Sequence, residues 1–97
     1  ERFMKKIFTD QEISYCRGRY PQIAARFASK EAVMKALGTG IRGVPWKSIE
    51  VYRARGKAPE ILLHGNAKKK SQELGIKRIA LSISHSRNYA IASVVAE

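Results

Sequence analysis

The segment between Pro21 and Gly38 constrains the fold more than any other part of the chain. Proline is tolerated in the first turn of a helix and glycine commonly ends one, so these residues bound a helix that runs to about Leu37. Within it, alanine recurs at every fourth position from Ala24 to Ala36. Residues four apart share a helical face, so this stripe of small side chains lets another element approach closely.

Shorter elements flank this helix. Thr9 and Glu12 form a T-x-x-E capping box, which predicts a helix from about Asp10 to Cys16. Apolar and polar residues alternate after the glycine-rich stretch 38–43, with turn residues between the alternating runs. The pattern predicts strands from 49, over 60–64, over 79–84 and over 89–95, with a helix from a cap at Asn66 to Gly75. We expect an α+β fold in which helices pack on a small, mainly antiparallel sheet.

Size and charge limit the classes of protein that fit. Ninety-seven residues suit one domain with a modest core, which oligomerisation would extend. No apolar run approaches the ~20 residues of a membrane helix, and the charged start is unlike a signal peptide. The single cysteine, Cys16, excludes an internal disulfide, and we expect a cytoplasmic protein. A net charge of +11 favours anionic partners: nucleic acid, an acidic membrane, a phosphorylated molecule or an acidic protein.

Two stretches around the end of the long helix carry residues suited to phosphate chemistry. Glu31 and Lys35 are four apart and share one face. They form either an ordinary surface ion pair, or a carboxylate that holds Mg²⁺ beside a lysine that neutralises phosphate oxygens. The run Gly38-Thr39-Gly40 follows, where glycines allow a backbone to approach a phosphate or simply end the helix.

A third candidate lies at the end of a predicted strand, where His85 stands between Ser84 and Ser86. The histidine is either a hydrogen-bonded turn residue or part of a ligand site. A P-loop hydrolase is disfavoured because the chain lacks G-x-x-x-x-G-K-[ST], and a serine hydrolase because it lacks G-x-S-x-G. The lysine run 68–70 is interpreted as a solvated helix face.

Together these pieces resemble a known family. The run RFASKEAVMKALGTG at 26–40 resembles the central signature of bacterial holo-acyl-carrier-protein synthases and carries the K-E-x-x-x-K core of the phosphopantetheinyl transferase superfamily. WKSIEV at 46–51, a glycine turn at 56–59, SISHS at 82–86 and YAIASVV at 89–95 resemble the rest of the family pattern in the same order. The resemblance covers essentially the whole chain as a single transferase domain.

The resemblance implies a reaction and its residues. A transferase of this family moves 4′-phosphopantetheine from coenzyme A to a serine of an acidic acyl carrier protein, as in fatty-acid biosynthesis, with Mg²⁺ as cofactor. Glu31 resembles the magnesium ligand, and Lys35 the phosphate-binding lysine that also handles protons. Further residues resemble parts of the coenzyme A cleft: Arg26, Lys30, Gly38, Thr39, Gly40, His85 and Ser86. The helix at 10–16 resembles a carrier-docking helix. The family implies a homotrimer with active sites between subunits, and neither a nucleic acid nor a membrane as partner.

One departure from the family concerns the start of the chain. Family members begin with a strand whose G-x-D aspartate is a second magnesium ligand, and these 97 residues start after that point. We therefore expect this polypeptide alone to be poorly active. Two other classes stay open: a carrier-binding scaffold without catalysis, which would leave coenzyme A unconverted, and a basic nucleic-acid-binding module, which would bind duplex DNA with steep salt dependence.

Overall fold

A computed structural model describes residues 2–38, 43–85 and 89–97. Three helices come first: α1 (Arg2–Ile7), α2 (Asp10–Cys16) and α3 (Tyr20–Leu37). A short 3₁₀ turn, η1 (Trp46–Ser48), leads into strand β1 (Ile49–Tyr52), followed by β2 (Glu60–Leu63) and helix α4 (Gly65–Glu73). Strands β3 (Ile79–His85) and β4 (Ala90–Ala96) complete the described chain.

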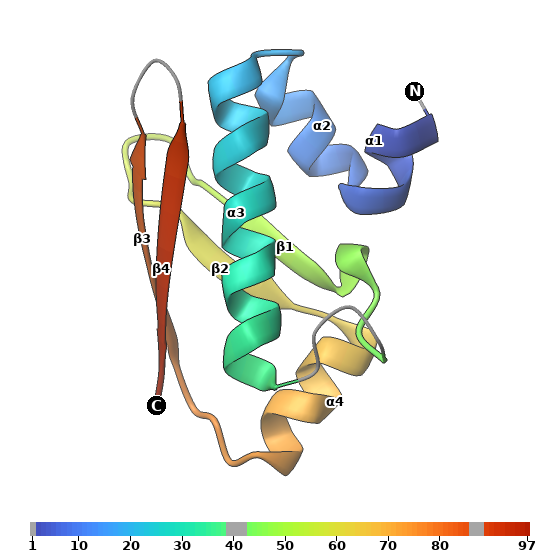
Figure 1. Ribbon diagram of the computed structural model, residues 1–97, viewed down its shortest axis with the longest axis vertical. Helices are drawn as coiled ribbons and strands as arrows, with labels where there is room; N and C mark the ends of the chain where they lie inside the picture. Colours follow the sequence, from blue (N-terminus) through green and yellow to red (C-terminus); the bar gives the residue numbers. More distant parts are fainter. Residues whose placement is uncertain (1, 39–42, 86–88) are drawn as a thin grey trace.

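The long helix α3 is the central element. Figure 1 shows it between the β3–β4 hairpin on one side and α1 and α2 on the other, while the β1–β2 hairpin crosses behind it. Pro21 lies in its first turn, and Gly38 ends it with a φ of 74°, a left-handed conformation that glycine adopts without strain. The predicted boundaries of this helix are confirmed.

The strands form two antiparallel pairs. In the first pair Ile49 lies opposite Leu63, and in the second Ile79 lies opposite Ala96. Helices on a small antiparallel set of strands make an α+β fold, as the sequence predicts. The two pairs are separate two-stranded sheets, and β2 and β3 lie against each other without forming a ladder.

The core forms where the second half of α3 meets β1 and α4. Its buried apolar side chains come from four segments of the chain: Val33, Met34, Leu37, Val44, Ile49 and Ala67. Half-buried apolar residues from β2, β3 and β4 pack around them. Because α3 contributes half of the buried set, its apolar face is stabilised mainly by this cluster.

One helix was missed by the sequence analysis, and one predicted cap was wrong. Residues 2–7 form α1, for which the sequence shows no cap, and its last residue Ile7 is buried. Helix α4 begins at Gly65 with His64 as its N-cap residue, so Asn66 lies inside the first turn and does not cap it. The carbonyl of His64 accepts the amides of Ala67 and Lys68, which starts the helix two residues early. The predicted turn at 86–88 lies outside the described residues.

The core can be tested with one substitution at two leucines. Leu37→Ala removes a side chain that is 1% exposed and should lower the free energy of unfolding by about 2–5 kcal/mol, because a cavity adds to the lost burial. The control Leu74→Ala changes a side chain that is 49% exposed, and its effect should stay below about 1 kcal/mol. Urea unfolding followed by circular dichroism measures both, and equal losses would contradict the assigned core.

Candidate active site

The outward face of α3 carries both candidate catalytic residues. Glu31 and Lys35 are exposed, and within the described residues neither side chain forms an ion pair. The ordinary surface ion pair that their spacing allows is therefore not formed. One turn before Glu31, the ring of Phe27 stacks on Trp46 with centroids 5.0 Å apart and planes at 17°. The carboxylate and the ammonium are thus free to bind another charged group.

An apolar groove of about 350 Å³ leads to Glu31. Phe3 from α1, Tyr20 and Phe27 from α3, and Ala90 from β4 are among the residues that line it. The alanine stripe takes part, because Ala24 and Ala28 form the floor on α3. Glu31 is the only charged residue of the groove among the described residues, so a bound polar group meets one carboxylate in mainly apolar surroundings.

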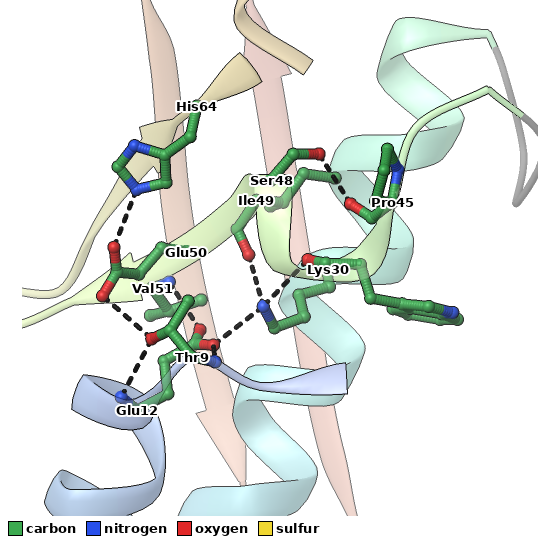
Figure 2. A network of polar contacts seen from close by, with 10 residues as sticks. Thr9, Glu12, Lys30, Pro45, Ser48, Ile49, Glu50, Val51 and His64 are labelled. Carbon is green, nitrogen blue, oxygen red and sulfur yellow. Dashed lines mark hydrogen bonds and ion pairs between the residues drawn. The ribbon is translucent and has the colours of Figure 1, made fainter. Parts of the chain in front are cut away.

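Lys30 differs from its predicted place in the coenzyme A cleft. Its side chain is 0% exposed, and its ammonium lies 2.8 Å from Glu12 Oε1. The same nitrogen donates to the carbonyl oxygen of Trp46 at 3.1 Å and to that of Ile49 (Figure 2). An ammonium has three donors, and all three are used inside the protein. Lys30 therefore joins α3 to α2, η1 and β1 and does not face a ligand in this structure.

Glu12 is the acceptor at the centre of this network. Its Oε1 also accepts the Thr9 amide at 2.9 Å, which completes the predicted capping box. Its Oε2 accepts the amide of Val51 at 2.8 Å. The carboxylate is buried, and burial lowers the pKa of its partner Lys30 while the charge of Glu12 opposes that shift. Close geometry and full hydrogen bonding keep both groups as an ion pair.

A second branch leads from this network to the surface. The Thr9 hydroxyl donates to Glu50 Oε2 at 3.0 Å, and Glu50 Oε1 lies 2.8 Å from His64 Nε2 (Figure 2). Glu50 is buried, whereas the His64 side chain is 51% exposed. The network thus runs from solvent at the start of α4 to Lys30 in the middle of α3.

Arg26 lies in a separate basic cavity of about 170 Å³. Its side chain is 5% exposed, and its guanidinium carbon lies 4.2 Å from the centre of the Tyr15 ring. Arg53 reaches the same cavity and donates to the Tyr15 hydroxyl at 3.4 Å. Among the described residues, Arg26 Nε has no hydrogen-bond partner. A buried donor without an acceptor, beside a second arginine, suits an anionic ligand.

The charges of this cavity act on Tyr15. Burial alone would raise the pKa of its phenol, but the hydrogen bond from Arg53 and the charges of Arg26, Arg53 and Arg19 outweigh burial. The net pKa of Tyr15 lies below the usual value for tyrosine. Positive potential in the cavity therefore stabilises a negative oxygen.

The remaining predicted site residues are placed only in part. Gly38 ends α3, one turn after Lys35. The backbone of His85 pairs with Ala90 at the end of the β3–β4 hairpin. Thr39, Gly40 and Ser86 lie outside the described residues. Among the described residues no group of three histidine, cysteine or acidic side chains could hold a metal alone, and no helix is long and apolar enough to cross a membrane.

Comparison with known families decides the class of this site. Residues 1–94 match the model of the 4′-phosphopantetheinyl transferase superfamily. The chain belongs to this superfamily. It is 48% identical over 101 residues to the holo-[acyl-carrier-protein] synthase of Koribacter versatilis, covering all of this chain and 81% of that protein. The synthase of Halothermothrix orenii is 47% identical over 100 residues, which cover all of this chain and 80% of that protein.

Solved structures of the superfamily share the fold. The holo-[acyl-carrier-protein] synthase of Helicobacter pylori, in complex with coenzyme A, has a TM-score of 0.87 at 34% identity, over 99% of this chain and 82% of that chain. The Neisseria meningitidis synthase has a TM-score of 0.87 at 36% identity, over all of this chain and 81% of that chain. The predicted resemblance, fold class and transferase class are confirmed.

Sequence reasoning missed three residues of this transferase's site region. Tyr15 and Arg53 line the basic cavity with Arg26, although they are 38 residues apart in the chain. Glu12 pairs with Lys30. In the sequence, the capping box is a sufficient reason for a glutamate at position 12, so nothing indicated this second role. The charge of Arg53 next to a strand end was the only available signal, and a basic chain offers many such arginines.

The basic cavity can be tested through Tyr15. Its phenol should titrate below the usual range for tyrosine. Arg53→Gln should move the pKa of Tyr15 upward, because it removes both a hydrogen bond and a charge. The control Arg55→Gln removes an exposed charge nearby in sequence and should move it less. Nuclear magnetic resonance of labelled tyrosines follows each phenol, and a Tyr15 pKa that ignores Arg53 would contradict this geometry.

Proposed function

We propose that this protein transfers 4′-phosphopantetheine from coenzyme A to a serine of an apo-acyl carrier protein, releasing adenosine 3′,5′-bisphosphate. Membership of the superfamily and the 48% identity to a holo-[acyl-carrier-protein] synthase support the reaction. The Glu31 carboxylate, exposed on helix α3 beside Lys35 and without an ion pair among the described residues, is the observation that carries the proposal. A phosphoryl transfer needs charged groups placed around the phosphate more than it needs covalent chemistry from the protein.

Glu31 is the proposed magnesium ligand. Its carboxylate is exposed, and carboxylate oxygens are the hard donors that Mg²⁺ prefers. One such ligand suffices for an ion that keeps several waters and shares substrate phosphates. When bound, the ion would neutralise negative charge that develops on the phosphate oxygens.

The residues of α3 would handle the other charges of the reaction. The carrier serine oxygen attacks the phosphorus that bears pantetheine, and the bond from that phosphorus to the bisphosphate oxygen breaks. Lys35, one turn beyond Glu31, would bind a pyrophosphate oxygen of coenzyme A and stabilise the departing charge. The serine proton would pass to Glu31, the carboxylate on this face of α3.

The basic cavity would bind another phosphate of coenzyme A. Arg26 supports this assignment, because its buried Nε lacks a partner in the described chain and Arg53 adds a second positive charge. The motif positions Gly38, Thr39, Gly40, His85 and Ser86 complete the proposed cleft. Arg26 is a rigid donor here, since its packing on Tyr15 fixes the guanidinium plane.

We also propose that the active protein is a homotrimer with its sites between subunits. The outer face of β4 carries Ile91 and Val95, 56% and 55% exposed, while the alternate residues pack toward α3. A strand that is apolar on both faces is suited to burial on both. His85 and Glu31 would then serve one site from different chains.

The proposed protein partner is an acidic carrier. The chain's net charge of +11 would attract it, and α1 exposes Arg2, Lys5 and Lys6 in front of the apolar groove. Helix α2, predicted as the docking helix, follows α1 directly and would share this surface. A cytoplasmic location fits such a partner and a free, buried Cys16.

The reaction is tested by the mass of the carrier. Apo-carrier incubated with coenzyme A, Mg²⁺ and this protein, preceded by its G-x-D strand, should gain about 340 Da, the mass of a transferred phosphopantetheine group. Glu31→Ala should lower the rate by at least about 100-fold, because the proposed metal ligand is lost. The control Glu73→Ala removes an exposed acid of α4 and should leave the rate unchanged. No gain with any acidic carrier would overturn the transferase assignment and favour a scaffold.

The assembly is tested separately by light scattering. Val95→Lys places a charge on the apolar face of β4 and should convert trimers to monomers. Leu74→Lys makes the same kind of change at the exposed leucine that follows α4, and that variant should stay trimeric. A monomeric unmodified protein, or a trimeric Val95→Lys variant, would be inconsistent with this interface.

A further inference from the structure

The buried ion pair between Glu12 and Lys30 lies directly behind the proposed catalytic face of α3. Lys30 precedes Glu31 in the chain, so the two side chains leave the helix about 100° apart. Lys30 points inward to three acceptors from α2, η1 and β1, whereas Glu31 is exposed beside the groove. Any rotation of the helix about its axis would break contacts of Lys30 and displace the carboxylate of Glu31.

Direct binding of coenzyme A by Lys30 is disfavoured by the same geometry. The side chains of both Lys30 and Glu12 are 0% exposed. A phosphate that bound Lys30 would have to displace the Glu12 carboxylate, which also accepts the amides of Thr9 and Val51. Breaking those contacts would leave buried donors without acceptors.

We propose that Glu12 and Lys30 are positioning residues, which hold Glu31 in place for the metal and the serine without touching coenzyme A. This inference rests on the proposed role of Glu31. Groups behind a metal ligand commonly change metal affinity or activity 10–100-fold when they are altered, because small displacements of the ligand are enough. A role in stability alone would leave the metal site of a folded variant unchanged.

The pair offers a variant that separates these roles. Removing one partner leaves a buried charge alone, so Glu12→Gln or Lys30→Met singly should destabilise the protein strongly. Changing both together removes the two charges at once, and such paired replacements are often tolerated. The double variant should therefore have a higher thermal midpoint than either single variant, while Glu31 loses its exact support.

Two binding measurements on the full-length protein form the test, both well below the lowest thermal midpoint. Calorimetry first measures coenzyme A binding without Mg²⁺, which should change less than about twofold in the double variant if Lys30 does not touch the ligand. It then measures Mg²⁺ binding to the coenzyme A complex, which should weaken about 10–100-fold. The rate of carrier modification should fall by a similar factor.

Two controls make the result specific. Ser71→Ala removes another buried polar side chain, bonded only within α4, and should leave Mg²⁺ binding unchanged. If the double variant does not fold, Glu12→Asp serves in its place. It keeps the charge but is one methylene too short to reach both Lys30 and Val51, so Mg²⁺ binding should weaken in the same direction.

Each outcome decides a different point. Unchanged Mg²⁺ binding in a folded double variant or Glu12→Asp protein would overturn the positioning role and leave a purely structural one. Weaker coenzyme A binding without Mg²⁺ in the double variant, with unchanged binding in Glu12→Asp, which keeps Lys30, would overturn it in favour of direct contact by Lys30. Glu31→Ala is measured alongside: if that variant also binds Mg²⁺ normally, the proposed function of Glu31 fails, whatever the buried pair does.

Discussion

The Glu12–Lys30 ion pair closes the outer edge of β1, and the arrangement of helices around that strand depends on it. The carbonyl oxygen of Ser48 accepts a hydrogen bond from the amide of His64. Every second residue of β1 therefore directs its backbone groups toward β2, whereas the backbone groups of Ile49 and Val51 point away from β2. The Ile49 carbonyl accepts from Lys30, and the Val51 amide donates to Glu12. Side chains of two helices thus supply hydrogen-bond partners for backbone groups that would otherwise be unpaired at this edge.

The buried Glu12–Lys30 ion pair lowers stability relative to an apolar pair, but it defines the position of α3 more sharply. Removing two charges from water is unfavourable, and apolar residues of similar volume would often stabilise a core as well or better. Apolar residues, however, would allow α3 to slide or turn against β1 with little penalty. Fixed donors and acceptors on α2, α3 and β1 select one register, because every other register leaves a buried charge unpaired.

The signature K-E-x-x-x-K therefore combines two kinds of residue, one that is buried inside the protein and two that are exposed. On a helix, Glu31 and Lys35 share a face, and Lys30 lies on the adjoining, buried side. Neighbouring positions of the motif thus differ: Lys30 supports the helix, and Glu31 is the proposed metal ligand. Because the two residues are adjacent on one helix, a displacement of Lys30 also displaces Glu31. A sequence pattern alone records only that the three residues occur together.

The sequence was sufficient for features that depend on local rules. Proline and glycine bounded α3, a capping box marked α2, and alternation located the strands. Features that depend on distant partners were not accessible. Helix α1 has only six residues and no capping signal in the sequence, so it depends on tertiary packing around Ile7. The burial of Lys30 depends on acceptors 16 to 19 residues away in the chain, which no spacing rule links to it.

The basic cavity extends the same reasoning from geometry to ligand. Arg26 is nearly as buried as the ion pair, yet its Nε has no acceptor in the described chain. Leaving such a donor unpaired disfavours the folded state, and a ligand anion that supplies the acceptor removes this penalty. A ligand that binds only the folded state also stabilises that state. Arg26 would therefore destabilise the free protein and favour the complex with an anion. On α3, the proposal thus gives two roles to buried charges: Lys30, which has its partner, would orient the site, and Arg26, whose Nε has none among the described residues, would select an anionic ligand.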